Sequence, residues 1–363
     1  MDAAADNRPA SPAVQGARVE TATGLSRLVL FAGLVVVVVF AALPSFAGRE
    51  AVQNLIFVFY MLALAEMWNL LAGYAGLVSV GQQAFVGLGG YLLFASAIMA
   101  GIDPLVAIPL AGIGAGLAAL IAAPVIFRLR GAYFAIGTWV VAEVWRLIFA
   151  QIRDLGGGTG MSLPTSVVNS LPGLHAIREL FDVRIPAARD ILDYWVALAI
   201  AVLAIAAAYA VLRSRLGLAL SAIRDSEAAS GSAGVNNFRT KLLVYVFTAV
   251  GTGMVGALIY LQKARISPDS AFSVLDWTAY VIVIVVIGGI GTLEGPIVGV
   301  LVFYLLQTYL ADYGTWYLIL LGALAIAVML LAPYGLWGFV ARRFGLVLLP
   351  VRRRLVLPKD PTM

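Results

Sequence analysis

The chain has 363 residues, of which 62% are hydrophobic and 12% are charged, and its mean hydropathy is +0.98. This composition excludes a soluble globular domain and predicts an all-α polytopic membrane protein, because long apolar runs cross a bilayer as helices. The net charge of +5 does not indicate nucleic-acid binding, since most Lys and Arg residues lie in short segments between or beyond the apolar runs. With no cysteine and only His175, no metal site or cofactor is expected.

Ten membrane-spanning helices are expected between two polar tails. Residues 1–26 are rich in Ala, Pro and small polar residues and predict a disordered cytoplasmic tail, residues 27–340 predict one transmembrane domain, and residues 341–363 predict a basic cytoplasmic tail. The predicted spans are 28–47, 51–72, 84–100, 104–127, 132–152, 193–212, 241–262, 277–293, 296–311 and 315–333.

The distribution of basic residues predicts the orientation. If the N-terminus is cytoplasmic, most Lys and Arg residues fall in inner segments, so both termini are expected inside. This makes 153–192 an outer loop and 213–240 an inner loop. An alternative is that 28–43 is the core of a cleaved signal peptide, since Ser45 and Ala47 are small residues at the required spacing, but the length of the apolar run favours a retained span.

Three ionisable residues are candidates for charges inside the membrane. Glu143 and Arg146 share one helical face and predict a structural ion pair. Glu66 leaves two interpretations open: a polar contact between helices, or a group on a solute pathway. The chain lacks a phosphate-binding glycine loop and a recognisable catalytic set, so an enzyme is not expected, and energy for transport is expected to come from a partner.

Glycine is common and has two expected roles. Closely spaced glycines at 112, 114 and 116, and at 251, 253 and 256, predict tight packing between helices. The stretch "GYAGLVSVGQQAFVGLGGY" at 73–91 also carries polar residues, which indicates a broken or re-entrant helix around a solute path. Its neutral amides suit an uncharged or zwitterionic solute.

A second interrupted segment, at 288–296, is the expected partner of the first. Two such segments in corresponding halves predict a pseudo-repeat around a central pathway, although a plain turn explains either segment alone. The predicted pathway residues are Asn69, Gly73, Gly76, Ser79, Gln82, Gln83, Gly288, Gly289 and Gly291.

The inner segment "SRLGLALSAIRDSEAASGSAGVNNFRTK" at 214–241 predicts a docking surface for a soluble protein. A merely solvated loop would not explain its apolar residues, which are Leu216, Leu218, Leu220 and Ile223.

Four blocks of the sequence resemble the permease subunits of bacterial ABC importers for branched-chain amino acids, of the type called the M subunit. The blocks are "GYAGLVSVGQQAFVGLGGY", "RLRGAYFAIGTWVVAEVWRLI" with "LGGGTG", "LSAIRDSEAASGSAGVNNFRTKLLVYVFTA" and "VIGGIGTLEGPIVG". The resemblance implies a permease domain that pairs with a second permease subunit, two cytosolic ATPase subunits and an extracytoplasmic solute-binding protein. It also implies that the ATPase contacts Arg224, Asp225, Glu227, Ala228, Ala229, Gly234 and Asn236.

The sequence departs from the family pattern at two places. Gly231 and Gly234, together with Ser230 and Ser232, lower the helix propensity of the ATPase-contacting segment. Gln83 stands where the family usually has a small residue, which leaves branched-chain amino acids, urea and short amides open as substrates.

The function expected from these features is ATP-driven import of an amino acid by alternating access. The alternative is a stand-alone channel for a small neutral solute such as urea, which would leave the inner segment unexplained. The C-terminal "RRFGLVLLPVRRRL" indicates contact with anionic membrane lipid or, as the simpler explanation, an orientation signal.

Overall fold

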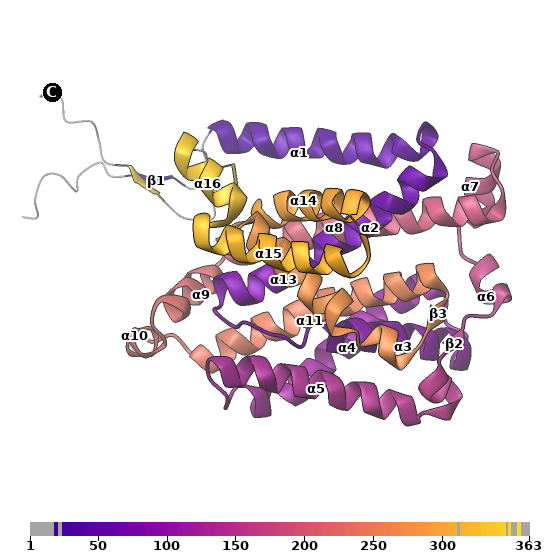
Figure 1. The fold of residues 1–363 in the computed structure, drawn as a ribbon, viewed down its shortest axis with the longest axis horizontal. Coiled ribbons are helices and arrows are strands. Elements are labelled where there is room, and N and C mark those ends of the chain that lie inside the picture. The colour runs from indigo at the N-terminus through magenta and orange to yellow at the C-terminus, as the bar shows by residue number, and fades with distance from the viewer. Residues whose placement is uncertain (1–17, 21–23, 311–312, 346–347, 350–353, 357–363) are drawn as a thin grey trace, which may run out of the picture.

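The structure, a computed structural model, describes residues 18–20, 24–310, 313–345, 348–349 and 354–356. Nearly all of the regular structure in these ranges is α-helix, and the long helices lie side by side in one bundle (Figure 1). Most of the two predicted tails, 1–26 and 341–363, falls outside the described residues.

Ten apolar helices occupy the ten predicted spans. They are α1 (Gly24–Ala42), α2 (Arg49–Asn69), α3 (Gln83–Met99), α4 (Pro104–Ile126), α5 (Ala132–Gln151), α8 (Ile185–Arg213), α11 (Asn237–Lys263), α13 (Tyr280–Gly288), α14 (Gly295–Leu310) and α15 (Thr315–Leu331). Within the described residues, seven helical segments are long and apolar enough to cross a membrane, and Phe31–Ser45, Gln83–Met99 and Gly295–Leu310 are shorter apolar helices. The all-α polytopic prediction is confirmed.

The connections are partly helical. They contain α6 (Thr165–Asn169), α7 (Leu174–Phe181), α9 (Arg215–Asp225), α10 (Glu227–Ser232), α12 (Pro268–Ala271) and α16 (Gly335–Phe344), with π-helical turns at Leu70–Tyr74 and Leu275–Ala279. Two antiparallel pairs join β1 (Arg18–Glu20) to β4 (Arg354–Val356) and β2 (Met161–Ser162) to β3 (Arg265–Ile266).

The structure differs from the predicted organisation in two boundaries and in the secondary structure of the inner segment. The helix that contains the span predicted at 193–212 begins at Ile185, and its first turns are partly buried, with Ala188, Ile191 and Leu192 inside the bundle. The inner segment is helical for most of its length rather than a loop, because α9 has an apolar face to bury. The predicted domain end at 340 falls inside α16.

The connections gather at two opposite ends of the bundle (Figure 1). The α9 end contains α9, α10 and α16, and the α7 end contains α6, α7 and the β2–β3 pair. Contacts support this division: Leu349 N donates to Glu294 Oε1 at the α9 end, over 2.8 Å, whereas Arg49 pairs with Asp190 at the α7 end. The connections therefore alternate between two faces, as a multi-pass membrane protein requires.

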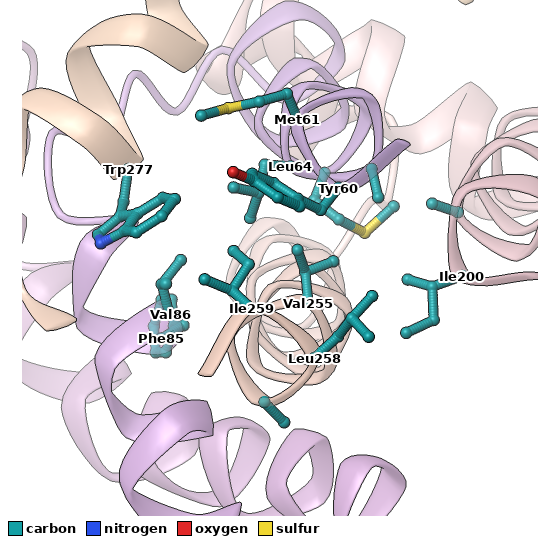
Figure 2. Packing of buried hydrophobic residues seen from close by; sticks show 14 of the residues in the cluster. Tyr60, Met61, Leu64, Phe85, Val86, Ile200, Val255, Leu258, Ile259 and Trp277 are labelled. Carbon is teal, nitrogen blue, oxygen red and sulfur yellow. The ribbon is translucent and has the colours of Figure 1, made fainter. Parts of the chain in front are cut away.

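The core forms around α2 and α11. Val255, Leu258 and Ile259 of α11 lie between side chains of α2, α3 and α8 (Figure 2), and all three are buried. The membrane-spanning window of α2 is 89% buried, compared with 22% for that of α5. The central position of α2 places its end, where the first interruption begins, inside the protein.

The predicted glycine packing is confirmed between α11 and its neighbours. A β-carbon at Gly256 would lie 2.2 Å from the carbonyl oxygen of Val86 in α3, and one at Gly112 of α4 would lie 2.5 Å from Met254 Cγ. Hydrogen at these positions lets the helix backbones approach closely.

Candidate functional site

The chain turns back into the bundle after α2. Leu77 N donates to Leu71 O, Trp68 Nε1 donates to Ser79 O over 2.8 Å, and Gln82 Nε2 donates to Leu64 O over 2.9 Å. The segment 75–82 thus runs antiparallel to α2, and α3 begins beside Leu64, about 15 Å along the helix axis from Tyr74. The broken, re-entrant helix predicted from 73–91 is present.

Hydroxyl groups from distant helices satisfy the backbone of this break. Val80 N donates to Thr138 Oγ1 over 3.0 Å, and Gln83 N donates to Thr278 Oγ1 over 3.2 Å. Irregular backbone is tolerated at membrane depth where protein supplies such partners. The sequence analysis missed Thr138 and Thr278, because nothing in one sequence links them to a segment so far away along the chain.

The two glutamines are buried and only partly hydrogen-bonded. Gln82 Nε2 also donates to Thr252 Oγ1 over 3.4 Å, and the Thr278 hydroxyl donates to Gln83 Oε1. Gln82 Oε1 and Gln83 Nε2 have no partner among the described residues. A cavity of about 10 Å³, lined in part by Ser79, Gln82 and Thr252, lies beside them. This space is too small for an amino acid.

The second interruption packs directly on the first. Gly291 N donates to Asn69 Oδ1, and Asn69 Nδ2 donates to Thr292 O, both over 2.8 Å. A β-carbon at Gly73 would lie 2.6 Å from Gly291 N, so glycine is required for this approach. The predicted pairing of the two segments is therefore borne out as a contact, while their role in a solute pathway stays a prediction.

The turn between α13 and α14 depends on its glycines. Gly289 and Gly291 have φ of 134° and 76°, which L-residues with side chains rarely adopt. A β-carbon at Gly288 would lie 1.9 Å from Gly295 O. Thr292 Oγ1 donates to Gly289 O over 2.8 Å, which closes the turn.

Arg224 connects α9 to both interruptions. Its Nη1 donates to Gly73 O over 3.1 Å and lies 3.7 Å from where a β-carbon on Gly291 would stand. Gly76, with φ of 69°, lies against the same side chain. We call Asn69, Gly73, Gly291 and Arg224 the junction. Arg224, which the sequence analysis expected to contact a soluble partner, is exposed and its Nε also lies 3.6 Å from Asp225 Oδ1, and that expected contact stays a prediction.

The other predicted coupling residues lie on the surface of the α9 end. The exposed ones are Asp225, Glu227, Ala228, Ala229, Gly234 and Asn236. Lys241 Nζ is 2.8 Å from Glu227 Oε1, and Asn237 Nδ2 donates to Glu227 O over 2.7 Å, so α10 is fixed to the start of α11. The low helix propensity of the segment matches the short length of α10.

The three ionisable residues predicted inside the spans differ in the contacts that they make. Arg146 Nη2 is 2.6 Å from Glu143 Oε1, which confirms the ion pair, and Arg146 Nη1 also reaches Asp269 Oδ1 over 2.6 Å. Glu66 is 0% exposed, and neither of its carboxyl oxygens has a partner among the described residues. A polar contact between helices does not account for Glu66 in this conformation.

One buried acid was missed. Asp193 is 1% exposed and lies 3.7 Å from Arg189 Nε, near the α7 end. Arg189 Nη2 in turn donates to Gln262 O at the end of α11, over 3.0 Å. The predicted span began at 193, so the sequence analysis treated this acid as a boundary residue. The available signal was the four-residue spacing of Arg189 and Asp193, which places the two side chains on one face of a helix.

The bundle and its paired interruptions define a multi-pass membrane transport protein. The chain belongs to the family of permease components of branched-chain amino acid transport systems, whose model matches residues 48–332. It is similar to the high-affinity branched-chain amino acid transport system permease protein LivM of Salmonella typhimurium (strain LT2) and of Escherichia coli (strain K12). In each case the identity is 29% over 336 residues, which cover 90% of this chain and 77% of the relative. No solved structure matches the chain at comparable significance.

Proposed function

We propose that the chain is the permease subunit of an ABC importer for branched-chain or related amino acids, and that separate cytosolic subunits hydrolyse the ATP. The names of the family and of the two relatives support the substrate class. The observation that carries the coupling part of the proposal is the hydrogen bond from Arg224 of α9 to Gly73 at the first interruption. An exposed helix of the connecting segment thereby reaches the interior of the bundle.

The junction is suited to transmit movement. A partner that binds the exposed face of α9 and α10 moves Arg224, and Arg224 carries the displacement to Gly73 and, through the close contact there, to Gly291. Because both interruptions respond together, α2 and α13 change position as a pair. Such linked movement of broken helices is the basis of alternating access.

The predicted pathway residues are packed in the described conformation. Asn69, Gln82 and Gln83 are each at most 5% exposed, so this conformation is closed between the two interruptions. Separation of Gly73 from Gly291 opens the path in our proposal.

The orientation and partners follow from the two ends. We place the α9 end in the cytoplasm, with both tails, 1–26 and 341–363, on that side, because the basic residues concentrate there. Two ATPase subunits bind α9 and α10. The solute-binding protein binds the α7 end, at the outer loop 153–192, and a second permease subunit completes the membrane part.

Reconstitution tests the proposal against a stand-alone channel. The chain alone, and the chain with its second permease, ATPase and binding protein, are placed in proteoliposomes, and uptake of labelled leucine and urea is measured. We expect leucine uptake only with the full set and with ATP. Rapid urea flux through the chain alone, without nucleotide, would support the channel.

A substitution at Arg224 tests the coupling. We expect Arg224→Ala to reduce ATP-driven leucine uptake by roughly tenfold or more, since a hydrogen bond to a charged group is lost, while the ATPase still co-purifies. Arg224→Lys retains a donor and part of the activity. Arg215→Ala, an exposed arginine on the same helix, is the matched control. Loss of ATPase association in Arg224→Ala alone would show instead that Arg224 binds the ATPase.

A further inference from the structure

Two arginines at the end of α16 have no role in the function proposed above. Arg342 and Arg343 lie in its last turn and are exposed. The ion pairs between described residues all join other side chains, so neither arginine has a carboxylate partner in that part of the chain. Both belong to the basic end of the chain, for which the sequence analysis left lipid contact and an orientation signal open.

The short helix α16 turns away from the direction of α15 (Figure 1). α15 ends at Leu331, and the chain passes through Pro333 before α16 begins at Gly335, whose φ is 71°. A β-carbon at Gly335 would lie 2.3 Å from Gly289 Cα, and Gly338 is also buried. The small residues of α16 therefore pack on the second interruption, at the α9 end of the bundle.

The surface of α16 next to the arginines is apolar. Leu336, Phe339 and Arg343 are exposed and share one face of the helix, since they are spaced by three and four residues. Leu331 and Phe344 are also exposed. Helices that combine exposed apolar and basic side chains lie at the boundary between lipid chains and headgroups. The end of α15, an apolar helix of the bundle, is where such a boundary is expected.

An open cavity of about 350 Å³ lies between the end of α15 and α16. It is lined by residues 331–334, Phe339, Arg342 and Arg343. Arg342 Cζ is 3.2 Å from the centre of the Tyr334 ring. This stacking orients the guanidinium plane and leaves the N–H groups at its edge available, and a planar guanidinium can bind a phosphate group through two such donors.

We propose that this cavity, the α16 pocket, binds an anionic phospholipid. Arg342 and Arg343 hold the phosphate, and Leu331 and Phe339 contact the first carbons of the acyl chains. A lipid is favoured over a soluble phosphate because apolar and basic side chains share one pocket at the expected membrane surface. Since α16 packs on Gly289, the bound lipid also holds the second interruption in place. The inference does not depend on which solute the protein imports.

Site-specific quenching tests the pocket. The chain has no cysteine, so Phe339→Cys in the purified full-length protein carries a single fluorophore. Phosphatidylglycerol and phosphatidylcholine, each with a doxyl quencher near the headgroup, are titrated into the detergent micelles. We expect half-maximal quenching at a roughly tenfold lower mole fraction of phosphatidylglycerol, because two basic residues attract its anionic headgroup. Equal quenching by the two lipids would overturn the proposal.

Substitution of the arginines tests the phosphate contacts. Arg342→Gln/Arg343→Gln, in the same labelled protein, is expected to abolish the preference for phosphatidylglycerol. Arg128→Gln/Arg130→Gln is the matched control, because it removes two exposed arginines from the α4–α5 connection at the same end of the bundle. We expect the control to keep the preference. An equal loss in both variants would overturn the proposal, since the effect would then be one of general charge, and so would an unchanged preference in Arg342→Gln/Arg343→Gln.

A single substitution decides the matter if Arg342→Gln/Arg343→Gln is not recovered as folded protein. Arg343→Gln then replaces it, and we expect a several-fold loss of the preference, because one of two phosphate-binding charges is removed. An unchanged preference would overturn the proposal.

Competition distinguishes a lipid from a soluble phosphate. Glycerol phosphate is added to the labelled protein after phosphatidylglycerol, at millimolar concentration. We expect the quenching to persist, because the acyl chains contribute to binding. Full reversal would overturn the lipid proposal and identify a site for soluble phosphate esters.

Discussion

At the scale of single residues, Gly73 shows how one missing side chain shapes the site. Its α-carbon lies against Gly291, its carbonyl accepts from Arg224, and the Asn69 amide stands beside it. The sequence predicted Gly73 and Gly291 as special positions, but each by its own local pattern. Their direct contact depends on the path of the chain over the many residues between them.

Gly73→Ala is expected to destabilise the protein. The new methyl would lie 2.6 Å from both Asn69 Oδ1 and Gly291 N, and the backbone nitrogen cannot move without disturbing the turn. We expect a loss of about 1–3 kcal/mol in the free energy of unfolding, measured as a lower Tm of the purified protein in detergent. Gly33→Ala in α1 is the control, since nothing lies within 4 Å of its β-position. Equal Tm values for the two variants would contradict the close contact.

At the scale of elements, α11 is the helix around which the bundle packs. It meets α3 and α4 through closely packed glycines and carries α10 at its cytoplasmic start in the proposed orientation. Its glycine spacing was visible in the sequence. Which helices it packs against was not, because every apolar helix of the chain offers small residues.

Gly256→Ala is expected to force α11 away from α3. The methyl would lie 2.2 Å from Val86 O, which is backbone and cannot rotate aside. The expected cost is about 1–3 kcal/mol of folding free energy, again read from Tm. Gly322→Ala in α15 serves as the control because its β-position is open. A Gly256→Ala variant as stable as that control would show that the two helices do not pack so closely.

Asn236 has a structural role that is separable from partner binding. Its Oδ1 accepts from Arg239 N over 3.0 Å and caps the start of α11. Asn236→Ala is expected to cost about 1 kcal/mol, whereas Asn236→Asp keeps the cap. Stability by thermal unfolding and ATPase co-purification are measured on both variants. If Asn236→Asp is stable yet loses the ATPase, the asparagine itself contacts that partner.

At the scale of the whole molecule, the connections divide between two ends, and in the proposed assembly each end is the surface that a different partner can reach. The α9 end presents α9 and α10, together with the turn that holds Gly291. The α7 end presents residues 153–192, which the Arg49–Asp190 pair ties to α2, and the Arg146–Asp269 pair, which joins α5 to α12. A partner at one end reaches the other only through movement of the helices.

Single cysteines test the orientation, because the chain contains no cysteine of its own. Ser232→Cys lies at the α9 end and Glu179→Cys at the α7 end, both at exposed positions. A membrane-impermeant maleimide applied to intact cells is expected to label Glu179→Cys and to leave Ser232→Cys unlabelled until the membrane is opened. The reverse pattern would invert the proposed topology.

The sequence by itself determined that this is a polytopic helical protein, where ten apolar helices of the described residues lie, and which two segments interrupt them. Hydrophobicity and glycine content are local properties, so they can be determined from the sequence of each segment alone. Only the tertiary structure decided that Gly73 meets Gly291, that Arg224 donates a hydrogen bond to Gly73, and that Glu66 has no hydrogen-bond partner among the described residues. Those outcomes depend on which helices become neighbours, and neighbours are chosen by packing across the whole bundle.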